Sequence, residues 1–135
     1  MRVLFLCTLN AVRSPMAEAM AREYYPKHKF SSAGLVTGPQ DYFAVEVMQE
    51  IGLDISKHEP ISFSRLKSRN FDLVICLANE YEDEIKKLLE SNKLKYQFWK
   101  DIPSPGDMGG SRLMRLYGYR EIRDKIKARL KAWRI

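Results

Sequence analysis

The sequence has few residues of the kinds that build crosslinks and metal centres. It contains two histidines and two cysteines, Cys7 and Cys76. The two cysteines are far apart along the chain. Two cysteines so widely separated do not form a disulfide framework, and the scattered cysteines and histidines lack the spacing of a metal site. We therefore expect a protein without a metal ion or a cofactor, in a reducing compartment.

A long hydrophobic run is also missing. The N-terminus leads directly into an apolar run of about six residues, too short for the core of a signal peptide and far too short to span a membrane. The sequence shows no internal repeat, low-complexity stretch or linker. We predict one domain, 1–135, with no membrane contact and a cytoplasmic location.

Positive charge is in excess, with a formal net charge of +6 that is concentrated after residue 112. Such a stretch fits either a surface for nucleic acid or anionic lipid, or the solvated face of a helix. Apolar residues recur at helical spacing among these charges: Leu113, Leu116, Ile122, Ile126, Leu130 and Trp133. We therefore favour a solvated helix face and do not expect a nucleic-acid partner, although a general attraction for acidic or phosphorylated partners remains.

Apolar strand-like runs alternate with amphipathic helical segments along the whole chain. The strands are expected at 2–7, 28–33, 72–77 and 95–99, the helices at 14–25, 41–52, 80–92 and 111–134, and a short irregular or helical piece at 61–69. This alternation predicts an α/β fold: a single doubly wound, four-stranded parallel sheet of flavodoxin-like order, with helices on both faces. Ligands of such folds bind beyond the carboxyl ends of the strands.

The most informative segment lies where the first strand meets the first helix. Cys7 closes the apolar run 3–6, five residues follow, and Arg13 opens the helical stretch with Ser14 behind it. A strand–loop–helix junction gathers backbone N–H groups into an anion site, and these dipoles favour the thiolate form of a cysteine. A lone cysteine at a strand end is more often an inert core residue. The combination with Arg13, whose planar guanidinium can hold two phosphate oxygens, favours a functional thiol.

The segment 3–18, VLFLCTLNAVRSPMAE, resembles the phosphate loop of the low-molecular-weight protein tyrosine phosphatases, a family whose fold is shared by arsenate reductases. The resemblance continues at 32–34, 52–58 and 71–75 and covers nearly the whole chain. It implies a cysteine-dependent phosphomonoester phosphatase of the phosphotyrosine type, acting through a cysteinyl-phosphate intermediate. The expected substrates are a phosphorylated protein or a small aryl phosphate.

Cys7 is the expected nucleophile and Arg13 the group that neutralises the phosphoryl oxygens. The remaining residues of the loop are expected to bind the substrate's phosphoryl group: Thr8, Leu9, Asn10, Ala11, Val12 and Ser14. Asparagine tolerates left-handed backbone conformations, so Asn10 suits a tight loop. The resemblance implies that Asn10 holds the loop's shape and is tied by Ser32 and His58. Ser14 either donates its hydroxyl to the thiolate or caps the helix, and the sequence leaves both open.

The expected general acid is less well marked. Members of the family carry an Asp-Pro pair before the last helix, whereas this chain has Ser104-Pro105, and the carboxylates nearby belong to Asp101 and Asp107. A serine hydroxyl cannot deliver a proton efficiently. We expect Asp101 to be the general acid, since a one-residue adjustment of the loop would bring it in.

Two other functions compete with the phosphatase. The departure at Ser104 favours a phosphate- or phosphoprotein-binding module with weak or lost catalysis. Arsenate reduction requires two further cysteines that resolve the thiol adduct, whereas this chain has only Cys76, within an apolar strand-like run. An aromatic wall around the substrate is expected from Tyr42, Phe43, Tyr117 and Tyr119, each of which also suits a core or a helix surface.

Overall fold

A single parallel sheet organises the computed structural model. The structure describes residues 1–107 and 109–135, and the side chain of Asp107 falls outside this description. The strands are β1 (Arg2–Cys7), β2 (Lys29–Gly34), β3 (Leu73–Cys76) and β4 (Tyr96–Phe98). They pair in the order β2-β1-β3-β4, every pair parallel. This is the doubly wound, flavodoxin-like order that the sequence predicts.

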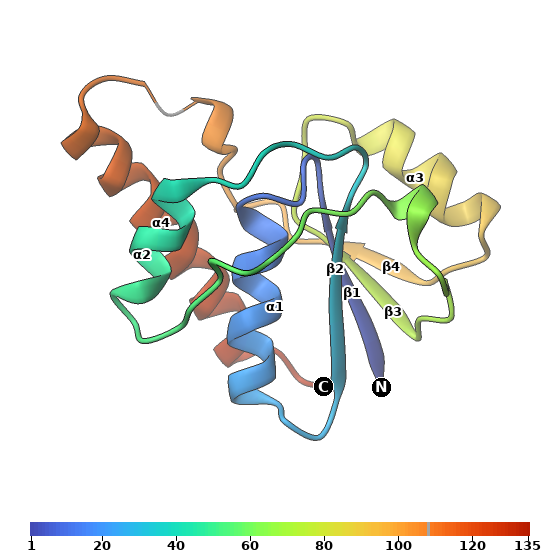
Figure 1. The fold of residues 1–135 in the computed structure, drawn as a ribbon. Helices are drawn as coiled ribbons and strands as arrows, with labels where there is room; N and C mark the ends of the chain where they lie inside the picture. The colour runs from blue at the N-terminus through green and yellow to red at the C-terminus, as the bar shows by residue number, and fades with distance from the viewer. Residues whose placement is uncertain (108) are drawn as a thin grey trace.

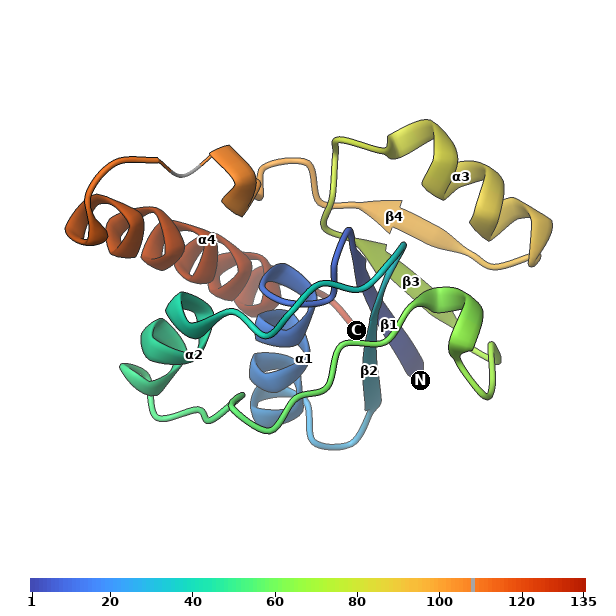
Figure 2. The same cartoon turned by 45° about the horizontal axis from the view of Figure 1, so that its top comes forward.

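Helices cover both sides of the sheet. They are α1 (Arg13–Tyr24), α2 (Tyr42–Gln49), α3 (Glu82–Ser91) and α4 (Arg112–Ala132), with short 3-10 helices η1 (Phe63–Arg65) and η2 (Pro105–Asp107). Helices α1, α2 and α4 gather on one side, while α3 lies apart from them beside β4 (Figure 1). The same separation is seen after rotation (Figure 2). The predicted strands and helices are confirmed, and η2 lies in a stretch that the sequence predicts as loop.

Strand β1 is the centre of the core. Five of its six residues are buried, and it pairs with β2 on one side and β3 on the other. A central strand with helices on both faces is covered from both directions, so its sequence is a continuous apolar run rather than an alternation. The position of β1 also places Cys7, its last residue, in the middle of the carboxyl edge of the sheet.

The basic C-terminal segment forms helix α4, and its charges are largely engaged within the molecule. Arg112 pairs with Glu46, and both Arg120 and Arg123 pair with Glu50. These contacts agree with a solvated helix face. Leu113 departs from the predicted apolar face, since its side chain is exposed near the start of the helix.

The two chain ends meet at the end of the sheet opposite to Cys7. The N-terminus begins β1, and the C-terminus lies close to it in both views (Figures 1 and 2). Within the described part of the chain, no helix is both long and apolar enough to cross a membrane.

Candidate active site

The loop 8–12 joins the carboxyl end of β1 to the start of α1 at Arg13. Val12 occupies the N-cap position and makes no side-chain hydrogen bond to the helix. The amides of the first helical turn have no acceptor inside the helix, and the helix dipole adds partial positive charge at this end. An anion is the natural partner for such a terminus.

The carbonyl groups of the loop face outward. Leu35, Val36 and Gly38 donate backbone hydrogen bonds to the carbonyls of Cys7, Thr8 and Leu9 in turn, at 3.0 to 3.1 Å. In a trans peptide the N–H points opposite to the C=O, so the amides that follow these carbonyls point away from the segment 35–38. These three amides therefore face the opposite side, where a bound anion would meet N–H donors.

Gly34 allows this close pairing. It is the last residue of β2, and a Cβ added there would lie 2.8 Å from the Asn10 nitrogen and from the Thr8 carbonyl oxygen, and 2.3 Å from the Val36 carbonyl oxygen. These are backbone atoms that cannot rotate away. A side chain at Gly34 would push the loop off the strand.

Asn10 sits at the centre of the loop's hydrogen bonds. It is fully buried and adopts a positive φ of 56°, the left-handed conformation expected for it. Its Nδ2 donates to Ser14 Oγ at 2.8 Å and to Ser32 Oγ at 3.0 Å. Its Oδ1 accepts from the Ile61 amide at 2.9 Å, and His58 Nε2 lies 3.1 Å from both its Oδ1 and its carbonyl oxygen. The structure thus brings Ser32 and His58 to Asn10.

Ser14 faces the thiol and does not cap the helix. Its Oγ lies 2.9 Å from Cys7 Sγ. Because Asn10 donates to the same oxygen, the hydroxyl hydrogen is left for Cys7 Sγ or for the Ala33 carbonyl, which is 3.4 Å away. The shorter contact is the one to sulfur. Val12 and not Ser14 is the N-cap residue, so capping is excluded, and donation to the Cys7 thiolate remains the prediction for Ser14.

Arg13 is held end-on by a carboxylate from another part of the chain. The side chain is only 4% exposed, and Nη1 and Nη2 donate to Glu80 Oε2 at 3.2 Å and Oε1 at 2.5 Å. The Thr8 hydroxyl donates to Glu80 Oε1 at 2.8 Å. Partial burial alone would raise the pKa of Glu80, but the hydrogen bonds from Arg13 and Thr8 lower this pKa to about 2. Glu80 therefore carries its negative charge at every physiological pH.

No sequence motif marks Glu80 as a functional residue. Its contacts with Arg13 and Thr8 join positions that are far apart in the sequence, so no local spacing reveals them. One signal was available: Glu80 follows the buried strand β3 at its carboxyl end, where ligand-facing side chains of parallel sheets are found.

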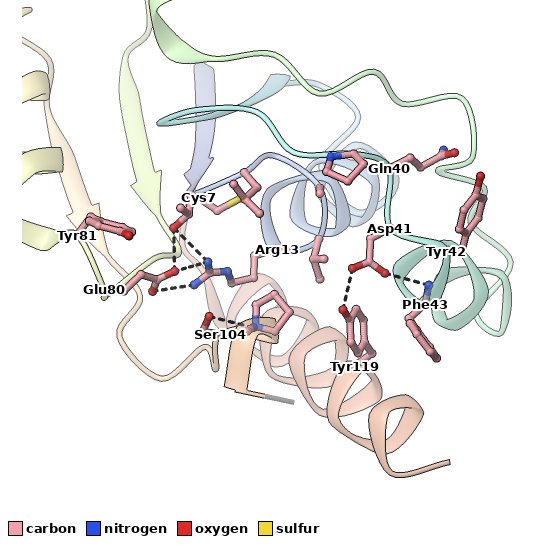
Figure 3. A pocket seen from close by; sticks show the side chains of 17 residues that line it. Cys7, Arg13, Gln40, Asp41, Tyr42, Phe43, Glu80, Tyr81, Ser104 and Tyr119 are labelled. Carbon is pink, nitrogen blue, oxygen red and sulfur yellow. Dashed lines mark hydrogen bonds and ion pairs between the residues drawn. The ribbon is translucent and has the colours of Figure 1, made fainter. Parts of the chain in front are cut away.

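A pocket of about 640 Å³ opens above Cys7 (Figure 3). We name it the Cys7 pocket, and it is lined by Cys7, Thr8, Leu9, Ala11, Val12, Arg13, Pro39, Gln40, Asp41, Tyr42, Phe43, Glu80, Tyr81, Ser104, Pro105, Gly106 and Tyr119. Asn10 and Ser14, both fully buried, support the pocket from behind. The aromatic wall includes Tyr42, Phe43 and Tyr119 as expected. Tyr117 projects from α4 with 58% exposure and is not among the described lining residues.

Asp41 lines the pocket, but both oxygens of its carboxylate accept hydrogen bonds from other parts of the protein. Its Oδ1 accepts from the amides of Phe43 and Ala44 at the start of α2, and its Oδ2 accepts from the Tyr119 hydroxyl at 2.7 Å. Burial and this hydrogen bond raise the pKa of Tyr119 to about 12. Asp41 therefore caps α2 and ties it to α4.

The expected general acid lies outside this pocket. Asp101 Oδ1 accepts from Arg129 Nε at 2.9 Å, and its side chain is half exposed in a neighbouring hollow with Asn79 and Lys100. The ion pair with α4 turns Asp101 away, so the structure does not bring it together with Cys7. Ser104 does line the pocket, and its Oγ accepts from the Gly106 amide at 3.3 Å. Asp107 lies outside the described side chains.

The second cysteine has no part in the pocket. Cys76 is fully buried in β3, and burial raises its pKa to about 12. A thiol in that state is unreactive at neutral pH. Among the residues that the structure describes, no group of three or more His, Cys, Asp or Glu side chains is placed to hold a metal ion.

Comparisons with known proteins extend over nearly the whole chain. The family model described as low molecular weight phosphotyrosine protein phosphatase matches residues 2–134. An arsenate reductase of Bacillus subtilis (strain 168) is 31% identical over 130 residues, covering 96% of this chain and 91% of the relative. The low molecular weight protein-tyrosine-phosphatase Etp of Escherichia coli (strain K12) is 27% identical over 128 residues, covering 88% and 86%. The tyrosine phosphatase Wzb from Escherichia coli K30, solved in complex with sulphate, shares the fold with a TM-score of 0.81 at 24% identity, covering 98% of this chain and 94% of that one.

Proposed function

Because this chain belongs to the low-molecular-weight phosphotyrosine protein phosphatase family, we propose that it is a cysteine-based phosphatase with Cys7 as its nucleophile and Arg13 as its phosphate clamp. The observation that carries the proposal is the arrangement at the floor of the Cys7 pocket. The thiol ends β1, the arginine and the serine that faces the thiol begin α1, and we infer that amides of the loop between them point inward. The family membership also confirms the resemblance in the sequence.

In the first step, the Cys7 sulfur attacks phosphorus while the bond from phosphorus to the leaving oxygen breaks. Arg13 and the inward amides neutralise the charge on the three equatorial oxygens. In the second step, water attacks the cysteinyl phosphate, the sulfur–phosphorus bond breaks, and inorganic phosphate and the thiolate are released. The Ser14 hydroxyl stabilises the thiolate before the first step and after the second.

The leaving oxygen must receive a proton, and we propose that the segment 101–107 supplies it. Two of the described carboxylates line the Cys7 pocket: Glu80 is held ionised by Arg13, and both oxygens of Asp41 accept hydrogen bonds from α2 and α4. Asp101 remains the first candidate, and it reaches the pocket only after releasing Arg129. Asp107 is the second.

We propose phosphorylated tyrosine in a protein, or a small aryl phosphate, as the substrate. The pocket walls are rich in aromatic and apolar side chains, among them Tyr42, Tyr81 and Leu9, which are all exposed at its mouth. An aromatic phosphoester would bury its ring against such walls. A thiolate nucleophile without a partner cysteine suits the reducing cytoplasm.

Arsenate reduction is not better supported, although an arsenate reductase is among the relatives. The chain has two cysteines, and the second, Cys76, is locked in β3 with a raised pKa. A thiol–arsenate adduct on Cys7 would have no resolving partner. A phosphate-binding module with lost catalysis is favoured by one feature, Ser104 in the pocket wall.

Turnover of p-nitrophenyl phosphate across a range of pH tests the proposal. We expect steady hydrolysis by the natural protein and none by Cys7→Ser, which retains its fold and its affinity for inorganic phosphate. Phosphate binding without turnover in the natural protein would establish the binding module instead. Substantial hydrolysis by Cys7→Ser would show that the nucleophile lies elsewhere.

A further inference from the structure

The Glu80 carboxylate is saturated by donors. Its Oε1 accepts from Arg13 Nη2 and from the Thr8 hydroxyl, and its Oε2 accepts from Arg13 Nη1 and from the Asn79 amide at 3.0 Å. A carboxylate with two donors on each oxygen has little remaining capacity to bind a proton or a water molecule. Glu80 is therefore unsuited to act as an acid or a base, even though it lines the Cys7 pocket.

The pairing leaves one edge of Arg13 free except for a long contact with the Thr8 hydroxyl. Glu80 engages the end of the guanidinium through Nη1 and Nη2, and Nη1 also donates to the Leu77 carbonyl at 3.2 Å. Among the described residues, the hydrogen bonds of Arg13 are made by Nη1 and Nη2, and none is made by Nε. Nη2 has a second N–H, which meets only the Thr8 hydroxyl at 3.4 Å. The side edge formed by Nε and Nη2 is thus available to a second planar pair of acceptors.

Glu80 and the Leu77 carbonyl fix the orientation of the Arg13 side chain. An arginine side chain that is free to rotate loses rotamer entropy when it binds two phosphate oxygens. The bidentate pair with Glu80 and the bond to Leu77 remove that freedom before substrate arrives. Figure 3 shows the Arg13 guanidinium facing the Glu80 carboxylate, with Cys7 nearby.

We propose that Glu80 is the positioning residue for the phosphate clamp: it holds Arg13 end-on so that its Nε–Nη2 edge is presented to the phosphoryl group. This inference rests on the proposed function, since it assigns a role within the same site. Thr8 takes part by bridging the loop to Glu80. The Glu80 carboxylate would then raise the rate of the chemical step through Arg13, without touching the substrate.

If Glu80 instead blocked the anion site, its removal would have the opposite effect on phosphate binding. A carboxylate that merely occupies the anion site would repel phosphate, so its removal would tighten phosphate binding. A carboxylate that positions the arginine would, when removed, weaken phosphate binding and slow the reaction. The isosteric change Glu80→Gln separates these outcomes, because it removes the charge and keeps the size of the side chain.

The affinity for inorganic phosphate, measured by titration calorimetry, needs no turnover and is the first readout. We expect Glu80→Gln to weaken phosphate binding and to lower kcat on p-nitrophenyl phosphate by about 10- to 100-fold, the usual consequence of losing a charged hydrogen-bond partner. Glu82→Gln is the matched control. Glu82 lies two residues further along, pairs with Lys86 and Lys100, and is not a described lining residue of the pocket. It should leave both quantities within twofold.

A double-mutant cycle shows whether Glu80 acts through Arg13. Arg13→Lys should be severe in the natural protein, since lysine lacks the fork, and should cost much less when Glu80→Ala is already present. Additive losses would overturn the proposal, as would tighter phosphate binding by Glu80→Gln. If the natural protein binds phosphate but does not turn over, the proposed function fails, and weaker binding by Glu80→Gln still supports the role of Glu80.

Discussion

Asn10 determines the shape of the phosphate loop. Its left-handed backbone costs a residue with a side chain about 1–2 kcal/mol. Hydrogen bonds to Ser14, Ser32, Ile61 and His58 offset that cost, and all of them converge on one buried amide. The loop is consequently ordered by its surroundings rather than by the anion it is built to receive.

The two thiols should differ sharply in reactivity. Cys76 is buried with its pKa raised to about 12, whereas Cys7 lines the pocket beside the Ser14 hydroxyl. We expect iodoacetate at pH 7 to modify Cys7 completely before Cys76 reacts detectably. Peptide mass spectrometry after timed quenching measures both sites. Inorganic phosphate should protect Cys7, and equal labelling of the two thiols would contradict this assignment.

Substitutions in the segment 101–107 should identify the proton donor. We expect Asp101→Asn to lower the rate modestly on p-nitrophenyl phosphate and severely on alkyl phosphates, by about 10²–10⁴. The reason is that p-nitrophenolate departs unaided, whereas an alkoxide needs a proton. Comparing kcat for the two substrate types is the measurement.

Asp107→Asn is the comparison for that experiment. A selective loss in Asp107→Asn alone would move the role to Asp107. If neither variant discriminates between aryl and alkyl phosphates, the segment supplies no acid, and Ser104 marks a protein with weakened catalysis.

Residues whose role depends on a local motif were predictable, and those that act across the fold were not. Cys7, Asn10 and Arg13 lie within seven consecutive residues, so their spacing indicated the site. Glu80 reaches Arg13 only because β1 and β3 are neighbours in the sheet. Asp101 was expected at the pocket from its position before the last helix, but its ion pair with Arg129 is a long-range contact.

At the scale of elements, α2 is fastened to α4 by one acidic residue. Glu50 follows the end of α2 and accepts hydrogen bonds from both Arg120 and Arg123. The hydrogen bond from Arg120 outweighs the effect of partial burial and, with that from Arg123, lowers the pKa of Glu50 to about 2. At the other end of α2, Asp41 makes a second link to α4 through the Tyr119 hydroxyl.

The contribution of Glu50 should depend on pH. Because its pKa is lowered on folding, its stabilisation is fully present above pH 4.5 and is lost as the pH falls toward 2. We expect Glu50→Gln to lower the free energy of unfolding at pH 7 by about 1 kcal/mol after solvent screening. Urea unfolding at pH 7 and at successively lower pH measures it, and the difference should shrink below pH 4.5.

Glu121→Gln provides the control for that measurement. Glu121 makes an exposed ion pair with Lys125 on the same helix. Its replacement should change the unfolding free energy by less than about 0.5 kcal/mol. A constant difference between Glu50→Gln and the natural protein down to pH 2 would refute the ionic link.

The spacing of apolar residues predicted which segments are strands and which are helices, but it did not predict the residues at which they end. The continuous apolar runs of β1 and β3 and the spaced apolar residues of α4 each indicated the correct structure. The 3-10 helix η2 depends on a turn at Ser104 whose hydroxyl accepts from Gly106, a contact that no periodicity signals. Leu113 fitted the helical repeat but lies beyond the region that other elements cover.

For the whole molecule, an aromatic cluster anchors the C-terminus to the sheet. The Trp133 ring lies 6.2 Å from Phe5 and 5.7 Å from Trp99, and it also meets Phe30 and Tyr25. The Tyr25 hydroxyl donates to the Trp133 carbonyl at 3.0 Å. These contacts join the first strand, the last helix and the sheet.

Removal of Trp133 should destabilise the protein without altering its chemistry. We expect Trp133→Ala to lower the free energy of unfolding by about 2–4 kcal/mol, because it deletes a large, mostly packed ring. Thermal unfolding measures the change. The kcat on p-nitrophenyl phosphate well below Tm should stay within twofold, and Tyr117→Ala, at an exposed position of α4, should leave Tm nearly unchanged.

The two chain ends lie together at the amino ends of the strands, while the Cys7 pocket opens at their carboxyl ends (Figure 1). If either terminus were tethered to a support, the opening of the Cys7 pocket would therefore face away from that support. Immobilisation on a bead or fusion to a carrier through one end or the other should leave a bulky phosphorylated protein the same path to the thiol.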